Sequence, residues 1–377
     1  MELQTWATGH DGSLAVLELF SSAIIGFPGS KPRQLTRSSW TIPVILVSEL
    51  RRATAVSFSL EDSRLPAHRL GIMKLSVCLM LIAACVQPVM ACDLCAVYAA
   101  TEAQGGSGTG FFGGVAEQFT RFNTFQVDGR EAPNIGDQYI NSSLSQAFLG
   151  YNFNHRVGVQ FNLPVIYRDY GYKTDRGSEL GMGDISLIGN FRLYEKLTEK
   201  FTFNWTALGG LKFPTGDSGH LNPAEDDFAP GIGGHDLTLG SGSFDGLVGT
   251  GFFSRWKRLF LSGAMQYAIR SEGDFNYQFA NDWIWSGGPG VYLLLGHEHT
   301  LSVQAVVSGE TKSQDTIGGV PTDDTAITAV YLGPQISLTW SSKLSAQVGA
   351  DLPVSIATTG QQVVPDYRVR AVVMWRF

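Results

Sequence analysis

The chain ends on the stretch "YRVRAVVMWRF" (residues 367–377), in which two kinds of side chain alternate. The first set is mostly apolar and includes Val369, Val373, Trp375 and the terminal Phe377, whereas Arg368, Arg370 and Arg376 occupy intervening positions. Because successive side chains of a strand point to opposite faces, this alternation predicts a β-strand with one apolar face. An aromatic terminus so close to a tryptophan predicts that the strand ends at a membrane interface.

The same alternation recurs upstream, in residues 157–165, 201–213 and 301–308. Extending it along the chain predicts twelve strands near residues 111–125, 138–153, 156–168, 183–194, 201–213, 242–255, 258–270, 281–295, 300–310, 326–340, 343–354 and 366–377. Short polar turns alternate with long segments rich in Gly, Asp, Asn and Pro, and the last long segment is expected at residues 355–365. An even number of strands with short turns on one side and long loops on the other is typical of bacterial outer-membrane barrels.

The composition agrees with this layout. The 377 residues include 44 glycines, 11% aromatic residues and only 16% charged residues. The body of the chain has no apolar stretch long enough for a transmembrane helix. We therefore expect an all-β fold, a transmembrane antiparallel β-barrel of about twelve strands over residues 111–377. Aromatic residues near strand ends, among them Tyr151, Trp256, Phe260, Trp340 and Tyr367, are expected to form two interfacial girdles.

One apolar stretch precedes the barrel, "MKLSVCLMLIAACVQPVMA" at residues 73–91. It combines a basic start at Lys74, an apolar centre, Pro88 and small residues at its end, which are the features of a secretory signal peptide. Residues 1–72 then read as translated upstream sequence; a real extension followed by an internal signal anchor is the alternative. Residues 92–110 form a short segment, either periplasmic or folded into the lumen as a plug.

Two cysteines remain after the signal peptide, Cys92 and Cys95 in "CDLC". In an oxidising periplasm this spacing favours a local disulfide or exposed thiols over a zinc site. The preceding "VMA" also resembles a lipobox, so lipid attachment to Cys92 is an open alternative. No metal site is predicted.

Polar and charged residues fall on the set of positions opposite the apolar ones, and we expect them to face the lumen. They are Gln160, Asp184, Arg192, Lys212, Arg270, Gln304, Gln347, Asp351, Arg368 and Arg370. Such residues either line a narrow aqueous path or pair with one another and seal it.

Three glycine-rich phrases carry a family resemblance: "GMGDISLIGNFRL" (181–193), "LKFPTG" (211–216) and "LGSGSFDGLVGTG" (239–251). They resemble the outer-membrane family of putative transporters named for the meta-pathway of phenol degradation. The resemblance covers about the middle third of the exported chain, and it implies a barrel that passes an apolar or aromatic compound. The terminal Phe377 likewise resembles the aromatic signature that the barrel-assembly machinery recognises.

These observations predict a bacterial outer-membrane channel that passes a small solute passively, with membrane lipid, the assembly machinery and the solute as partners. A structural or surface-interaction barrel is one alternative. An outer-membrane lipid hydrolase is a remote one, with His220 and His235 beside Ser218 or Ser241 as its candidates. The acidic balance, a net charge of −7, argues against nucleic-acid binding. No phosphate-loop motif occurs, so no cofactor or energy coupling is expected.

Overall fold

The computed structural model describes residues 109–224, 228–296, 299–340 and 343–377. The expected upstream extension (1–72), the signal peptide (73–91) and all but the end of the segment 92–110 lie outside the described residues, as do Cys92 and Cys95.

Twelve antiparallel strands form a closed barrel, which confirms the predicted fold class and strand number. Each strand pairs with its neighbours in sequence, and β17 pairs with β1 to close the ring. The strands are β1 (Gly110–Val127), β3 (Tyr139–Asn152), β4 (Val157–Tyr172), β6 (Ser186–Leu197), β7 (Phe201–Lys212), β8 (Asp245–Trp256), β9 (Leu259–Ile269), β11 (Asp282–Leu295), β12 (His299–Lys312), β15 (Ile327–Trp340), β16 (Leu344–Thr358) and β17 (Gln361–Arg376).

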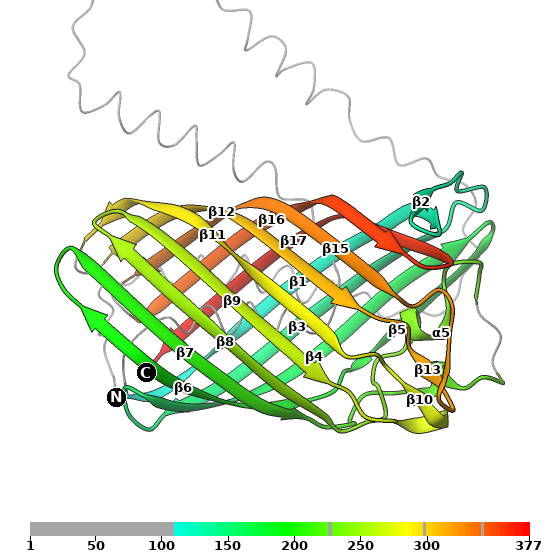
Figure 1. Cartoon of the computed structure of the whole chain (residues 1–377), viewed down its shortest axis with the longest axis horizontal. Helices are drawn as coiled ribbons and strands as arrows, with labels where there is room; N and C mark the ends of the chain where they lie inside the picture. The colour runs from blue at the N-terminus through cyan, green and yellow to red at the C-terminus, as the bar shows by residue number, and fades with distance from the viewer. Residues whose placement is uncertain (1–108, 225–227, 297–298, 341–342) are drawn as a thin grey trace, which may run out of the picture. The chain divides into compact units, whose positions relative to one another are not determined.

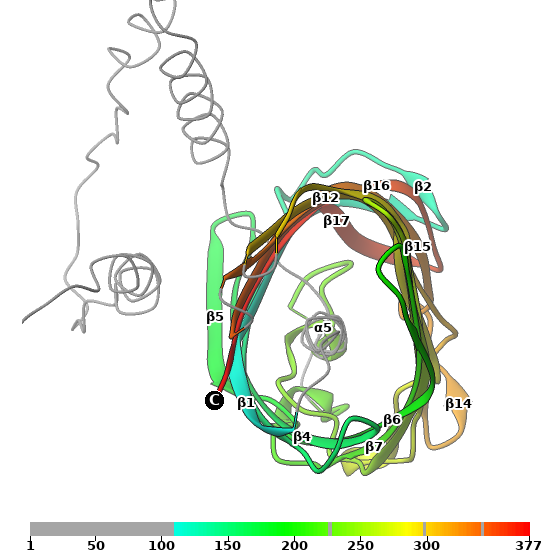
Figure 2. The ribbon, with the colours of Figure 1, turned by 90° about the vertical axis from the view of Figure 1, so that its left-hand side faces the viewer.

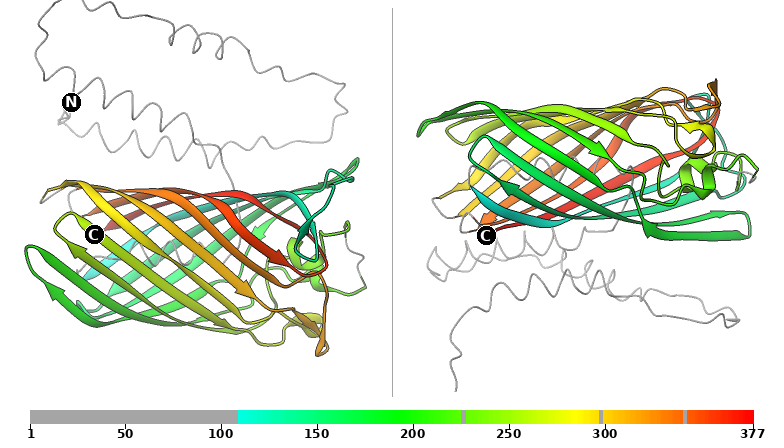
Figure 3. Two further views of the ribbon diagram at one scale, coloured as in Figure 1. Left: turned by 45° about the horizontal axis from the view of Figure 1, so that its top comes forward. Right: turned by 90° about the horizontal axis from the view of Figure 1, so that it is seen from below.

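The two ends of the barrel differ. One end, the short-turn end, carries the tight connections and the C-terminus, and the other, the long-loop end, carries most of the remaining elements (Figures 1 and 3). There, β2 (Arg130–Glu131) pairs with β1, and β5 (Asp175–Met182) extends β4 as a hairpin. The other elements at this end are β10 (Tyr277–Gln278), β13 (Thr316–Ile317), β14 (Val320–Pro321), η1 (Gly219–Leu221), η2 (Asp274–Asn276) and α5 (Gly234–Leu237).

One expected loop is absent. Residues 355–365 were predicted to be a long connection, but β16 and β17 run through them and leave only a turn at Thr359 and Gly360. Gly360 adopts a φ of +60°, which favours glycine, and its amide donates to Asp128 Oδ1 at 3.0 Å. The polar residues of this segment belong to a hairpin that extends past the membrane, where water can contact both faces of the strands.

The outer face of the barrel is apolar. Leu149, Val248 and Leu352 each expose between 46% and 63% of their surface. At the short-turn end, the Tyr151 ring packs edge-on against Phe111 and Phe153 at 4.7 and 5.2 Å. Such a belt with aromatic residues at its border fits a hydrocarbon layer and its interface.

Two residues depart from this pattern. Phe260, predicted to belong to a girdle, faces the lumen and is 8% exposed, because its position pairs with the inward-facing Arg255. Glu117 of β1 lies on the outward-facing set of positions, where it accepts hydrogen bonds from Ser143 (2.9 Å) and Ser145.

Among the described residues, no helix is both long and apolar enough to cross a membrane.

Candidate functional site

The described residues enclose a succession of cavities along the lumen, and three of them concern the site. The inner chamber, of about 450 Å³, lies at the short-turn end, and the outer chamber, of about 390 Å³, lies among the long loops. The middle chamber, of about 180 Å³, lies between them, and His235 borders both it and the outer chamber. The middle chamber is thus the smallest of these three in volume.

The loop between β7 and β8 (residues 213–244, the inserted loop) borders the middle chamber. Figure 2 shows its α5 within the ring of strands. Leu239 of the loop packs with the inward-facing Leu144 and Ile166. A second cluster joins the loop residues Ala229, Ile232 and Leu237 to wall residues Ile140, Tyr170 and Val363. Burial of these apolar side chains holds the loop inside the barrel.

Asp184, just before β6, anchors both ends of the inserted loop. Its Oδ1 accepts from the amides of Thr215 (3.1 Å) and Gly216 (3.0 Å). Its Oδ2 accepts from the amide and the hydroxyl of Ser241, both at 2.9 Å, and from Lys212 Nζ at 2.5 Å. Burial by itself would raise the pKa of Asp184, but the Lys212 ammonium and these hydrogen bonds lower it below its ordinary value of 3.8.

Glycine is required where the two ends of the loop meet. A Cβ on Gly240 would lie 2.5 Å from the carbonyl carbon and oxygen of Gly216, and one on Gly216 would lie 2.6 Å from the Leu239 oxygen. The phrases "LKFPTG" and "LGSGSFDGLVGTG" therefore fold against each other and against Asp184 of the phrase "GMGDISLIGNFRL". The residues that carried the family resemblance build the anchor of the loop.

Lys212 and Arg270, two of the predicted lumen residues, share one acidic partner. Asp245, which is fully buried, lies 2.8 Å from Lys212 Nζ and 2.8 Å from Arg270 Nη1. The sequence reasoning did not select Asp245. The strand register could have pointed to Asp245, because this residue is the direct cross-strand partner of Lys212.

A second ion-pair cluster joins Asp351 of β16 to two arginines of β17. Asp351 lies 3.1 Å from Arg368 Nε and 3.1 Å from Arg370 Nε, and all three side chains are buried. The Arg368 guanidinium also lies 3.6 Å from the centre of the Tyr331 ring and donates to Ser308 Oγ at 2.7 Å. The predicted lumen residues Lys212, Arg270, Arg368 and Arg370 therefore all pair with carboxylates.

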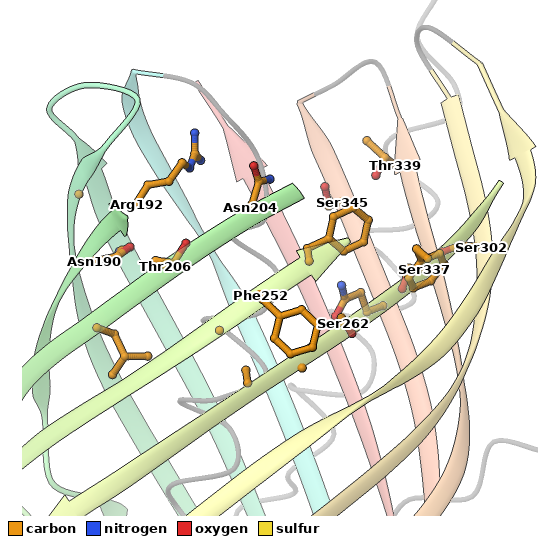
Figure 4. Close-up of a pocket in the computed structure, with 18 of the residues that line it drawn as sticks. Asn190, Arg192, Asn204, Thr206, Phe252, Ser262, Ser302, Ser337, Thr339 and Ser345 are labelled. Carbon is orange, nitrogen blue, oxygen red and sulfur yellow. The ribbon is translucent and has the colours of Figure 1, made fainter. Parts of the chain in front are cut away.

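The predicted glutamines occupy different parts of the wall. Gln160 and Gln146 both donate to Asn162, which in turn donates to Ser186, along β3, β4 and β6. Gln304 and Gln347 line the inner chamber. Figure 4 shows Asn190, Arg192, Asn204 and Thr206 on one side of this chamber and Ser302, Ser337 and Thr339 on the other.

Part of the inner wall is apolar, which the sequence reasoning missed. Ile188, Leu247, Ala268 and Ile284 form a buried cluster, and Leu208 and Ala264 pack against it. Leu208 and Ala264 also line the inner chamber together with Phe253, Phe260 and Tyr292, whose rings lie 5.6 and 5.1 Å apart in succession. We call these residues of β6 to β11 the apolar strip. The alternation of residues 201–213 had placed Leu208 in the same set as Lys212, but only polar and charged members of such sets were selected as site residues.

Arg192 lies in the inner chamber and contacts Glu195 Oε1 at 2.9 Å. Arg376, which faces inward on β17, lines the same chamber. The alternation of the last strand had placed Arg376 on the inward face without selecting it as a site residue.

The residues considered for a hydrolase make other contacts. Ser218 Oγ donates to Asp274 at 2.6 Å, whereas the Ser241 hydroxyl contacts Asp184 and Lys212. His235 lies 3.4 Å from Asp236, and His220 lies 3.2 Å from Glu179. Within the described ranges, no three His, Cys, Asp or Glu side chains form a group that could hold a metal ion.

Comparison with solved structures finds outer-membrane barrels. An outer membrane channel from Pseudomonas putida F1 is 14% identical over 71% of this chain and 96% of that chain, with a TM-score of 0.52. The translocator domain of the autotransporter NalP from Neisseria meningitidis is 11% identical over 74% and 93% (TM-score 0.38), and the monoaromatic hydrocarbon channel CymD is 7% identical over 71% and 89% (TM-score 0.32). The last two scores are too low to support an argument. No protein-family model and no curated protein matches the chain.

The protein is thus a transmembrane barrel with the fold of bacterial outer-membrane channels. The apolar outer belt and the closed sheet fit that setting, and the protein belongs in the bacterial outer membrane. The resemblance to the phenol-degradation family remains a prediction, because no sequence comparison supports it.

Proposed function

We propose that the protein is a passive channel for a small apolar or aromatic solute, as the family resemblance implies. The observation that carries this proposal is the apolar strip. Phe253, Phe260 and Tyr292 of this strip line a lumen cavity, and an apolar solute is stabilised when it leaves water for such a surface.

The size of the middle chamber supports the same proposal. A cavity of about 150 Å³ in another protein holds benzene. The middle chamber, at about 180 Å³, therefore suits a solute with one ring. No energy source is proposed, because the expected direction of movement is down a concentration gradient.

Conductance of the full chain, exported and purified from outer membranes, tests the proposal. Single-channel currents are recorded in planar bilayers with and without phenol. We expect small, stable current steps that phenol reduces in a concentration-dependent manner. A folded barrel that gives no steps, together with vesicles that take up phenol no faster than empty vesicles, would favour the structural or surface-interaction alternative.

The proposed partners follow from position. Phe377 is 75% exposed at the short-turn end, and its amide donates to the Phe111 oxygen at 3.0 Å. We propose that the barrel-assembly machinery recognises this residue during insertion, and that lipid of the outer membrane surrounds the apolar belt. Deletion of Phe377 should then lower the amount of assembled barrel and leave the conductance of each assembled channel unchanged.

A further inference from the structure

We infer that the inner chamber is a binding site for a small aromatic anion, such as an aryl carboxylate. The inference rests on the proposed passage of an aromatic solute and adds a charge to it. It follows from the distribution of charge and of aromatic rings around one cavity.

The charge in the inner chamber has one sign. Arg156, Arg192 and Arg376 line it, and none of the described residues that line it is Asp or Glu. The middle chamber differs, since Asp184 and Asp282 line it beside its basic residues. A carboxylate in the inner chamber would therefore meet several arginines, of which Arg192 already contacts Glu195 at 2.9 Å.

Two of these arginines, Arg192 and Arg376, have guanidinium N–H groups that could donate to a bound anion. Glu195 accepts from Nη1 of Arg192, and no other partner of this guanidinium occurs among the described residues. The side chain of Arg376 forms no hydrogen bond or ion pair with any described residue, although its backbone amide donates to the Lys343 oxygen at 2.8 Å. A guanidinium has five N–H groups in a planar fork that matches a carboxylate, so both arginines retain capacity for one.

The aromatic residues and Arg376 lie on opposite sides of the lumen, because β17 is six strands from β8 around the ring, whereas Arg192 of β6 is two strands from β8. Arg376 belongs to β17 and Arg192 to β6, whereas Phe253, Phe260 and Tyr292 belong to β8, β9 and β11. A solute between them can place a ring against the aromatic residues while its anionic group reaches a guanidinium. Neutral donors and acceptors such as Asn190 and Asn204 complete the polar side (Figure 4).

The test compares four probes that separate ring from charge. Benzoate has both features, acetate has the charge alone, benzyl alcohol has the ring alone, and benzylamine has the ring with the opposite charge. Binding to the purified full-length protein is measured by calorimetry and, separately, by block of single-channel current. We expect benzoate to bind about tenfold more tightly than each of the others, because charge-assisted hydrogen bonds and aromatic contacts add to each other.

Variants assign the two features to residues. Arg376→Gln and Arg192→Gln should each weaken benzoate and acetate about tenfold, which corresponds to about 1.4 kcal/mol, and leave benzyl alcohol unchanged. Phe253→Ala should weaken benzoate and benzyl alcohol and leave acetate unchanged. Arg258→Gln is the matched control, because it removes one positive charge at the same end, where Arg258 is exposed and donates to the Leu293 oxygen outside the chamber.

The outcomes separate the site from the proposed function. Equal binding of benzoate and benzylamine, or equal losses in the Arg258 and Arg376 variants, would overturn the anion site. A conducting channel with that result would keep the proposed function, whereas a silent barrel that binds benzoate as described would keep the site and remove the function. Arg376→Lys, which retains the charge near the C-terminus, tests the same position if Arg376→Gln fails to assemble.

Discussion

Substitution of Asp184 by alanine should release the inserted loop and widen the channel. The change removes the acceptor of five hydrogen bonds, from Thr215 N, Gly216 N, Ser241 N, Ser241 Oγ and Lys212 Nζ. Water can replace the acceptor at the exposed Thr215, and Lys212 retains Asp245 at 2.8 Å. The Ser241 hydroxyl retains the Ser243 hydroxyl at 2.9 Å, so two donors, Gly216 N and Ser241 N, lose their partner at partly buried positions.

The substitution should lower the free energy of unfolding. An unsatisfied buried donor costs about 1 to 3 kcal/mol, so two partly buried donors at the low end of that range cost about 2 kcal/mol in free energy of unfolding. Because these donors belong to the two ends of the inserted loop, the loss falls on the loop before the barrel wall. Conductance should therefore rise even where the strands remain paired.

Two measurements check this prediction, urea unfolding of the purified barrel and single-channel conductance. Asp217→Ala is the control, because it removes an acidic side chain from the same loop at an exposed position where it accepts only from Gly219 N. Asp184→Asn should fall between Asp184→Ala and the unsubstituted protein, since its oxygen can still accept from two amides. If Asp184→Ala matched Asp217→Ala in both unfolding and conductance, the anchor would not control the loop.

Three further predictions concern acidity, close packing and the outer face. The lowered pKa of Asp184 means that its contribution to stability is fully present above its ordinary value of 3.8 and is lost as the pH falls through the lower folded value. Conductance should thus stay constant from about pH 8 to about pH 5 and rise only in stronger acid. A series of single-channel records at different pH values would show this. Gly240→Ala should destabilise the loop by about 2 kcal/mol through its clash with Gly216, and protease should then cut the inserted loop faster than in the unsubstituted protein. Glu117→Leu should stabilise the barrel by about 1 kcal/mol in urea unfolding, because it removes a carboxylate from the lipid-facing side; an equal loss would show instead that the bonds to Ser143 and Ser145 outweigh its desolvation.

The barrel wall could be predicted from the sequence because its signal is local. A strand with lipid on one side and the lumen on the other alternates over its whole length, and the pattern of residues 367–377 reports this without knowledge of any partner strand. The hairpin at Gly360 was missed for a related reason. Beyond the membrane both faces of a strand meet water, so alternation ends before the strand does.

The anchor could be predicted only in part. Lys212 and Asp245 face each other across two paired strands, so a correct register would have joined them, and the predicted start of this strand at residue 242 was three residues early. The contact between Asp184 and Ser241 has no such signal. This contact forms because a loop with no periodic pattern folds back into the lumen, where Leu239 packs against Leu144 and Ile166.

The same contacts indicate that the inserted loop is fixed in place within the lumen. The backbone approach of Gly216 and Gly240 leaves no room for a side chain, Asp184 holds both ends, and two apolar clusters fix the part between them. A loop that opened would expose all of these groups at once, at a cost of several kcal/mol for the polar contacts alone. In the proposed channel, selection by size belongs to the walls of the middle chamber, while selection by chemistry belongs to the arginines and aromatic rings of the inner chamber. The two can be altered separately: Asp184→Ala should admit larger solutes and keep the preference for aromatic anions, whereas Arg376→Gln should abolish that preference and keep the size limit.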